Sequence, residues 1–263
     1  MFGAEIAKGW VEDIAFGWED SEIPPYKVNQ KKLKHLAVIC DGNRRAAMDM
    51  GYQANLGHLA GMEVIKGVAR ASRAWNINTV TFWTWSTDNW RRDSVQVDFV
   101  MGLATENLSK QEFLEELVES GARFTHLGRK DRLPERLLLT IENLEKSTAI
   151  LNKFNLNLGL DYGGLDEIAR AYQKMVGREL GQVKLANPYI VYDYLDTKGF
   201  PLVDLVVRTG TNGGELPHTS GFMPLQTVNA AWIFLPDMFP NLTPEKLLGA
   251  IKKFERYDKR LGK

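Results

Sequence analysis

An acid, a glycine, an amide and two guanidinium groups follow one another from Asp41 to Arg45, directly after the apolar run at 36–40. Short runs of branched apolar residues are typical of buried strands. Asp41 offers carboxylate oxygens to a hard divalent cation, Gly42 lets the backbone approach a ligand, and an arginine binds phosphate oxygens in pairs. These residue types suit a diphosphate with its metal. A surface turn capped by Asp41 is the structural alternative.

A second polar segment, Ser86 to Arg92, follows the apolar and aromatic run at 79–85. In open α/β sheets, ligands bind outside the carboxyl ends of the strands. Two polar strand ends therefore predict a single crevice to which both contribute.

Apolar, β-branched runs alternate with segments of helical period along the chain. We expect strands at 36–40, 79–85, 122–127, 155–160, 203–207 and 228–235, and helices at 57–75, 95–120, 133–152 and 166–176. Long helical crossovers predict an α/β fold with an open, mostly parallel six-stranded sheet and helices on both faces. Alternation along 79–85 predicts that Trp83 and Trp85 point to one face.

The composition limits the classes of protein to which this chain could belong. Lys plus Arg and Asp plus Glu both number 33, so no overall basic charge indicates a nucleic-acid partner. No apolar run approaches the roughly 18 to 20 residues of a transmembrane segment, and the acidic residues before Trp18 are unlike a secretory signal, so we expect a cytoplasmic protein. Cys40, the only cysteine, excludes an internal disulfide and is expected to be a packed thiol.

The polar segments resemble the motifs of the cis-prenyltransferases of the undecaprenyl diphosphate synthase type. In that family an Asp-Gly-Asn-x-Arg loop precedes a Gly-His pair and a Ser-x-(Glu/Asp)-Asn-Trp-x-Arg segment. This sequence has these motifs in the same order, at 41–45, 57–58 and 86–92, and further landmarks at 132–135, 158–167 and 204–209. The resemblance implies a catalytic domain at 35–263. It leaves 1–34 as an N-terminal extension of unknown role, interpreted as a helix plus a tether.

The resemblance implies a magnesium-dependent transferase that condenses an allylic diphosphate with isopentenyl diphosphate, forms a Z double bond and releases diphosphate. It places Mg²⁺ on Asp41 and assigns proton removal or its relay to Ser86 and Asn89. The substrate-binding residues that it implies are Gly42, Asn43, Arg44, Arg45, His58, Thr87, Asp88, Trp90, Arg92, Arg208, His218 and Ser220.

The sequence departs from the family pattern at four positions. After Arg208 it carries extra residues, and His218 stands where the family has a second arginine. Ala46 replaces a tryptophan, Ala54 an arginine, and Ala231 a glutamate that the resemblance assigns to magnesium. Imidazole is a weaker and more pH-dependent diphosphate ligand than guanidinium, so the second diphosphate site is expected to be weak.

Three functions remain open from the sequence. The first is a divergent transferase that makes a Z-prenyl or short branched isoprenoid, since 208–210 and 258–262 resemble branched-chain synthases. The second is an ordinary cis-polyprenyl diphosphate synthase whose missing groups a partner supplies. The third is a non-catalytic subunit or binding protein of the same fold.

Partners and product length follow from the resemblance. The family buries a region like 230–236 in a two-fold dimer, so we expect a homodimer, with a heterodimer with a complete synthase and peripheral membrane contact as alternatives. A tunnel between the helices at 57–75 and from 95 onward would set product length. Its candidate lining is Met48, Met50, Met62, Phe99, Met101 and Leu103, although core packing is the simpler interpretation of each.

Overall fold

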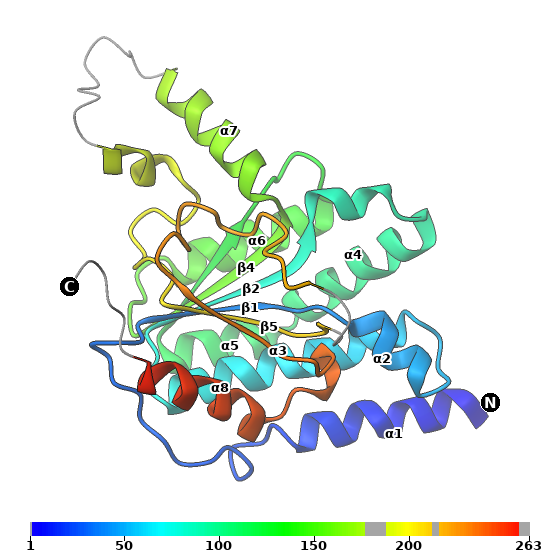
Figure 1. Cartoon of the computed structure of the whole chain (residues 1–263). Helices are drawn as coiled ribbons and strands as arrows, with labels where there is room; N and C mark the ends of the chain where they lie inside the picture. The colour runs from blue at the N-terminus through cyan, green and yellow to red at the C-terminus, as the bar shows by residue number, and fades with distance from the viewer. Residues whose placement is uncertain (1, 177–187, 212–215, 258–263) are drawn as a thin grey trace.

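A six-stranded sheet forms the centre of the computed structural model, which describes residues 2–176, 188–211 and 216–257. The strand order is β3-β4-β2-β1-β5-β6, and every pairing is parallel (Figure 1). The strands are β1 (His35–Ile39), β2 (Thr79–Ser86), β3 (Ala122–Leu127), β4 (Phe154–Tyr162), β5 (Leu205–Arg208) and β6 (Ala231–Phe234). The predicted parallel α/β sheet is confirmed.

Helices occupy most crossovers between these strands, and further helices precede the first strand and follow the last. They are α1 (Phe2–Phe16), α2 (Asn43–Asp49), α3 (Leu56–Ala74), α4 (Ser94–Leu108), α5 (Gln111–Ser120), α6 (Glu135–Thr148), α7 (Gly164–Val176) and α8 (Pro244–Arg256), with 3-10 turns η1 (Thr87–Arg91), η3 (Pro188–Tyr194) and η4 (Phe239–Asn241). The single helix predicted at 95–120 is wrong. Two helices occupy it, because the Ser109 hydroxyl donates to the Glu106 carbonyl and Lys110 is extended.

The two faces of the sheet are covered unequally. Leu36, Val80 and Leu156 lie in register on one face and share a core with α3, α4, α5, α6 and α8. On the other face, Ala37 and Val206 pack against Phe222 and neighbouring irregular segments. The start of α7 also lies on this second face, and the rest of the helix projects away from the body (Figure 1). Helices on both faces are therefore confirmed, but among the described residues α7 is the only α-helix on the second face.

The prediction for the two tryptophans of β2 is wrong. Trp83 stacks on Phe222 at 5.0 Å between ring centroids, whereas Trp85 packs in the opposite core against Trp90. The pairing with β4 shifts between Trp83 and Trp85, so Thr84 is an extra residue that reverses the alternation.

The N-terminal extension belongs to the same folded unit as the sheet. After α1, which lies along α3, the side chains of Trp18, Ile23, Val28 and Leu33 enter the main core. The segment 17–34 is thus packed rather than a free tether. Of the helices described, none is long and apolar enough to cross a bilayer.

Candidate active site

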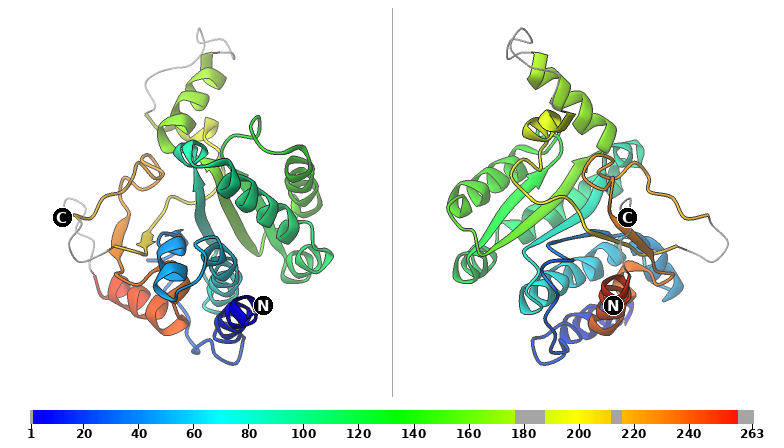
Figure 2. Two further views of the ribbon diagram at one scale, coloured as in Figure 1. Left: turned by 90° about the vertical axis from the view of Figure 1, so that its right-hand side faces the viewer. Right: turned by 60° about the vertical axis from the view of Figure 1, so that its left-hand side comes forward.

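A cavity of about 650 Å³ opens at the carboxyl ends of β1, β2 and β5, on the side seen in the left view of Figure 2. Every predicted site residue except Trp90 and His218 lines this cavity. Its lining comprises Asp41, Gly42, Asn43, Arg44, Arg45, His58, Ser86, Thr87, Asp88, Asn89, Arg92, Arg208 and Ser220, together with neighbours such as Met48, Thr84 and Gly163. The two polar strand ends therefore form one crevice, as predicted.

Asp41 is held between two guanidinium groups at the end of β1. Its carboxylate oxygens lie 3.2 Å from Arg45 Nη2 and 3.1 Å from Arg208 Nη2. The Thr209 hydroxyl donates to the Asp41 carbonyl at 2.9 Å, and the Phe239 amide donates to the same oxygen at 2.9 Å. Sequence reasoning gave Thr209 no role, because an ordinary threonine after a strand carries no signal of its own.

Arg44 and Arg92 line the cavity without forming an ion pair to any residue that the structure describes. Arg44 Nη1 donates to Gln96 Oε1 at 3.2 Å, and the Arg92 guanidinium lies 5.3 Å from the Trp85 ring centroid. Burial and the nearby Arg44 lower the pKa of Arg92. Two cations that repel each other in this way favour an anion between them.

His58 contributes a neutral imidazole to this site. Burial, followed by the charges of Arg92 and Arg44, lowers the pKa of His58 to about 4. Its Nε2 lies 3.5 Å from Nε2 of the buried Gln96, a residue that sequence reasoning missed. At neutral pH His58 therefore offers a hydrogen bond rather than a charge.

Gly57 explains how His58 reaches the cavity. A Cβ atom at this position would lie 1.8 Å from the Asn43 carbonyl oxygen, so only glycine lets α3 begin directly against α2. In the Gly-His pair of the sequence, Gly57 is therefore required for the packing of α3 on α2, and His58 lines the cavity.

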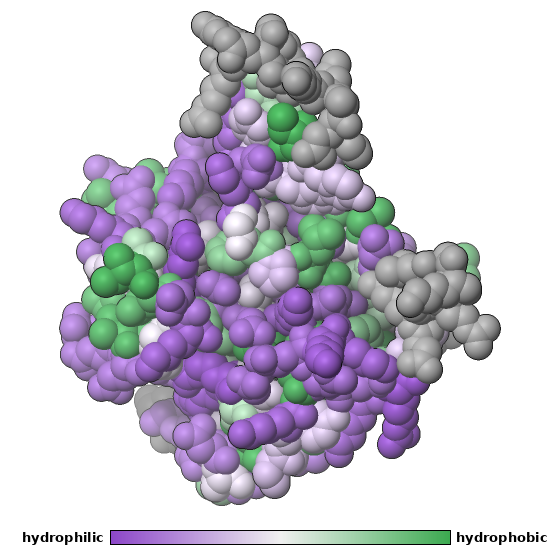
Figure 3. Space-filling view, turned by 90° about the vertical axis from the view of Figure 1, so that its left-hand side faces the viewer, coloured by the Kyte–Doolittle hydropathy of each residue, from purple (hydrophilic) through white to green (hydrophobic). Residues whose placement is uncertain are grey.

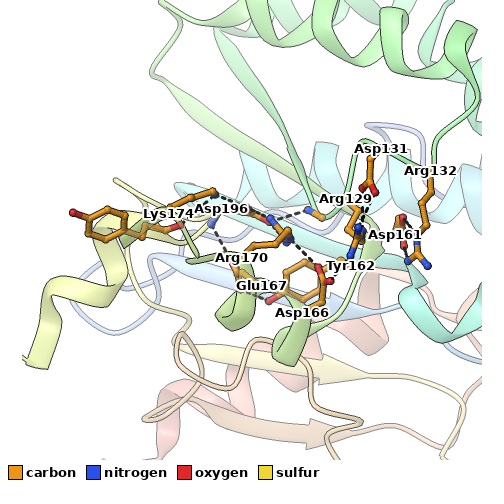
Figure 4. A network of polar contacts seen from close by, with 12 residues as sticks. Arg129, Asp131, Arg132, Asp161, Tyr162, Asp166, Glu167, Arg170, Lys174 and Asp196 are labelled. Atoms are coloured by element: carbon orange, nitrogen blue, oxygen red, sulfur yellow. Dashed lines mark hydrogen bonds and ion pairs between the residues drawn. The ribbon is translucent and has the colours of Figure 1, made fainter. Parts of the chain in front are cut away.

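The segment 86–92 is supported from behind by an arginine and a buried acid. Arg132 stacks over Trp90 at 5.5 Å. It also donates from Nε to Asp161 Oδ2 at 2.9 Å, and Figure 4 shows these two side chains. The Asp161 side chain is fully buried, and its backbone is left-handed, with φ 54°. Trp90 itself meets Trp85 edge to face, so it supports the cavity wall instead of lining it.

A second buried acid anchors the base of α7. The Tyr162 hydroxyl donates to Glu167 at 2.6 Å, Gln226 donates to it at 2.8 Å, and the Asp196 amide donates at 2.9 Å (Figure 4). Burial raises the pKa of Glu167. This network fixes Tyr162, which packs edge to face on Trp83 beside the cavity.

Arg208 organises the segment in which the sequence departs from its family pattern. Arg208 Nη1 donates to the His218 carbonyl at 2.7 Å and to the Ser220 hydroxyl at 2.8 Å. His218 Nδ1 lies 2.9 Å from that hydroxyl and faces Ser220 and Arg208. The role of His218 as a diphosphate ligand stays a prediction, and the extra residues at 212–215 lie outside those described, as does 258–262.

An apolar cavity of about 280 Å³ adjoins the polar one. Both are lined by Cys40, Asn43, His58 and Thr84, so the two spaces meet there. The apolar cavity runs between the sheet and α3, α4 and α5, past Leu160 near the carboxyl end of β4 to Phe154 at its start. Six residue steps of a strand cover about 20 Å, so this cavity extends along most of the length of β4.

The residues considered for a product tunnel divide between several environments. Met62 and Leu103 line the apolar cavity, Met101 is core, Phe99 packs against the core, Met48 lines the polar cavity and Met50 is exposed. Burial raises the pKa of the Cys40 thiol, which agrees with the predicted packed thiol.

The donor set suits a magnesium ion that is shared with a substrate. Asp41 and Asp88 are the carboxylates that line the polar cavity, and the described residues contain no group of three His, Cys, Asp or Glu that could enclose a metal. Mg²⁺ typically uses one or two carboxylates and completes its octahedron with water and phosphate oxygens. Asp41, with 38 % of its side chain exposed, fits that description.

The missing glutamate at Ala231 is not adjacent to Asp41 within this chain. Ala231 begins β6 and pairs with Leu205, which pairs with Leu36 at the amino half of β1. Asp41 lies five residues beyond Leu36, a strand distance of about 16 Å. A carboxylate at 231 therefore would not share a metal with Asp41 of the same chain. Ala46 and Ala54, the other departures, are both absent from the cavity lining.

Known proteins resemble this chain in sequence and in fold. A family model described as "Putative undecaprenyl diphosphate synthase" matches residues 39–262, nearly the whole chain outside the extension. The chain belongs to the cis-prenyltransferase family. Among relatives of this family, an isoprenyl transferase of Wolinella succinogenes is 36% identical over 233 residues, which cover 88% of this chain and 97% of the relative.

Other cis-prenyltransferases match over similar lengths. The tritrans,polycis-undecaprenyl-diphosphate synthase (geranylgeranyl-diphosphate specific) of Thermococcus kodakarensis is 33% identical over 88% of this chain and 87% of its own length. The solved structure of lavandulyl diphosphate synthase from Lavandula x intermedia, in complex with dimethylallyl diphosphate, has a TM-score of 0.80 at 27% identity and covers 89% of this chain and 100% of its own. A "probable undecaprenyl diphosphate synthase" from Campylobacter jejuni has a TM-score of 0.70 at 28% identity, covering 90% and 100%.

Proposed function

We propose that this cis-prenyltransferase moves the prenyl group of an allylic diphosphate to a second isoprenoid diphosphate and releases diphosphate. The observation that carries the proposal is the junction of a polar, arginine-lined cavity with an apolar cavity at Cys40, Asn43, His58 and Thr84. An allylic diphosphate has the same two parts, an anionic head and a hydrocarbon tail. The head suits the polar cavity and the tail suits the apolar one.

The diphosphate head is bound by the cations that lack a carboxylate partner. Arg44 and Arg92 offer forked donors to phosphate oxygens, and the neutral His58 adds a hydrogen bond. Gly42 and Asn43 bring backbone close to the same place. Arg45 pairs with Asp41 and sets the direction of that carboxylate.

Asp41 is the residue that would hold Mg²⁺ in this proposal. When bound, the ion neutralises negative charge on the departing diphosphate. The chain's own part is to orient the head so that its allylic carbon–oxygen bond lies at the junction of the cavities. Trp83 and Thr84 line the wall near that point and limit the access of water.

The reaction joins the allylic carbon to the double bond of the acceptor, while the allylic carbon–oxygen bond breaks and diphosphate leaves with its electron pair. The acceptor then loses a proton, and Ser86 and Asn89 line the cavity where that proton is released. An amide is a poor base, so Asn89 positions the acceptor and a diphosphate oxygen takes the proton.

How the acceptor substrate binds determines which of two kinds of product is formed. Arg208 already binds Asp41, the His218 carbonyl and Ser220, so it has little capacity left for the diphosphate of isopentenyl diphosphate. Chain elongation to a Z-prenyl diphosphate is favoured by the long apolar cavity. A short branched product is the second candidate, which the similarity to lavandulyl diphosphate synthase supports.

A homodimer is part of the proposal. Strand β6 is at the edge of the sheet, its Trp232 and Phe234 rings stack at 5.9 Å, and Val228 is 63% exposed beside it. An open edge strand with aromatic neighbours is suited to pairing with a second copy. A heterodimer with a complete synthase remains the alternative, and a cytoplasmic location stays a prediction.

The test is release of diphosphate by the purified protein with magnesium. Dimethylallyl, geranyl and farnesyl diphosphates are each supplied with and without isopentenyl diphosphate, and the organic extract is analysed by mass. Release that requires isopentenyl diphosphate indicates elongation, and release from an allylic diphosphate alone with a coupled product indicates branching. No release with any substrate would overturn the proposal in favour of a non-catalytic subunit.

A further inference from the structure

Two arginines of α3 separate the apolar cavity from an open hollow beneath the N-terminal extension. Arg70 and Arg73 line both spaces, and the hollow is otherwise bounded by residues 20–27 and the end of α3. Ala122 and Phe154, which begin β3 and β4, line the same end of the apolar cavity. The arginines therefore stand opposite the diphosphate site, at the far end of the space assigned to the tail.

Glu116 of α5 ties these arginines across the cavity. Arg73 Nη2 lies 3.0 Å from Glu116 Oε1, and Arg70 Nε lies 3.9 Å from the same oxygen. All three side chains are only partly exposed, between 26% and 43%. The far end of this mainly apolar cavity is thus lined by an ion pair. Lys66, Lys110 and Glu112 are the other charged residues of the cavity wall.

The extension fixes the arginines in this position. Arg70 Nη1 donates to the Trp18 carbonyl at 3.1 Å. The Trp18 ring fills the space that a Cβ atom at Gly67 would occupy, with ring carbon Cγ 2.2 Å from it, so glycine is required for this contact. The Trp75 indole donates to the Pro24 carbonyl at 2.8 Å and holds the next part of the extension on α3.

Hydrophilic side chains predominate on the face of the molecule at the amino ends of the strands, with separate hydrophobic patches between them (Figure 3). A tail longer than the apolar cavity would have to pass the ion pair. It would then move from a mainly apolar lining into a space that is bounded by charged groups and open to water. A hydrocarbon chain cannot replace the hydrogen bonds of the charges that it would desolvate.

We propose that Arg70, Arg73 and Glu116, held by residues 18–24 of the extension, form a charged partition that limits the length of the prenyl tail. This inference rests on the proposed function, because it needs the tail in the apolar cavity. It gives the extension, which lies outside the family match, a role in selecting the substrate or product by length.

The test measures binding of unreactive prenyl thiolodiphosphates of increasing tail length, with magnesium, by calorimetry. In the wild type, affinity should rise with each five-carbon unit until the tail meets the partition, and then cease to rise. In Arg73→Ala the rise should continue for at least one further unit, with affinity for that longer analogue about tenfold higher than in the wild type. Arg136→Ala, an exposed arginine of α6, is the matched control and should keep the wild-type limit.

Two further variants distinguish the effect of the side-chain charge at position 73 from the effect of its size. Arg73→Met keeps most of the side-chain volume and should also move the limit, whereas Arg73→Lys keeps the pairing with Glu116 and should preserve it. The same limit in the wild type, Arg73→Ala and Arg73→Met would overturn the partition while leaving the proposed function intact. If no analogue of any length bound to any of these proteins, the proposed function itself would fail, and the partition with it.

Discussion

Arg44 and Arg92 define the polar cavity at the scale of single residues, since the other two arginines of its wall are already paired with Asp41. The four arginines of the wall outnumber its two carboxylates, Asp41 and Asp88, so the cavity carries excess positive charge. In the proposed function, the diphosphate of the substrate would supply the opposite charge.

Arg92→Gln should weaken binding of an allylic diphosphate while leaving the fold intact. A charge-assisted hydrogen bond contributes about 1.5–3 kcal/mol, which corresponds to a loss of about 10- to 150-fold in affinity. The measurement is calorimetric titration with an unreactive analogue. Arg91→Gln, on the same turn but 87% exposed, is the control and should bind as the wild type does. Equal losses in both variants would mean that position 92 has no particular role.

Asp41→Ala should abolish magnesium-dependent turnover. Removing the carboxylate leaves the metal without its protein ligand, and a bound ion contributes several kcal/mol to such a step, so the rate should fall by more than about a hundredfold. Asp49→Ala, on the exposed side of α2, should retain activity. Unchanged turnover in Asp41→Ala, or the same metal dependence in both variants, would contradict the assignment.

Most residues of the polar cavity were predictable because their types are unusual at strand ends: an acid, an amide and arginines after apolar runs. Gln96 and Thr209 were not. Each contacts the site from an element that is distant in sequence from its partners, and neither differs from an ordinary polar residue of a helix or a turn.

Elements position these residues through buried polar contacts, and His35 shows how β1 is held beside β2. Its ring nitrogens lie 2.8 Å from the Pro201 carbonyl and 2.7 Å from the Thr81 hydroxyl. Burial lowers the pKa of His35 from 6.5 to about 4. The folded chain therefore keeps this imidazole neutral where the unfolded chain takes up a proton.

The free energy of unfolding should consequently fall as the pH decreases from 6.5 to about 4. Below the folded pKa both states are protonated, and the contribution of His35 is already lost. Urea unfolding across this range should show a shallower decline in His35→Gln than in the wild type. His58 and the carboxylates remain in both proteins, so the difference isolates His35. An equal decline in the free energy of unfolding of the two proteins would show that protonation of His35 does not destabilise the fold.

Arg132 and Asp161 hold the segment 86–92 in place, as His35 holds β1 beside β2. Arg132→Met leaves the buried Asp161 carboxylate without its cation, and because Arg132 is 37% exposed we expect a loss of about 2 kcal/mol, below the range for fully buried pairs. The double variant with Asp161→Asn should recover part of this loss. Urea unfolding of the single and double variants measures the coupling, and strictly additive losses would contradict it.

Most strand and helix positions were predictable from hydrophobic period, but α8 was not among the helices expected, and two local events were also missed. The extra residue Thr84 in β2 and the break at Ser109–Lys110 are not marked by glycine or proline. Both are set by packing between elements, which a single sequence does not reveal. The bulge matters for the site, because it sends Trp83 and Trp85 into different cores.

At the scale of the whole molecule, the polar cavity at the carboxyl ends of the strands and the apolar cavity that adjoins it form one path along the sheet. The extension, whose role the sequence left open, packs into the same core and reaches the far end of that path. Which residues meet across the sheet, including the distance between Ala231 and Asp41, depends on strand order. Strand order follows from the crossovers and was outside what the periodicity could predict.

The most direct test of this account is a crystal structure with farnesyl thiolodiphosphate and magnesium. We expect the diphosphate between Arg44 and Arg92, with the metal on Asp41, and the tail passing His58 into the cavity between the sheet and α3. A diphosphate bound elsewhere, or a tail lying along the outer surface while the apolar cavity stays closed, would contradict the account.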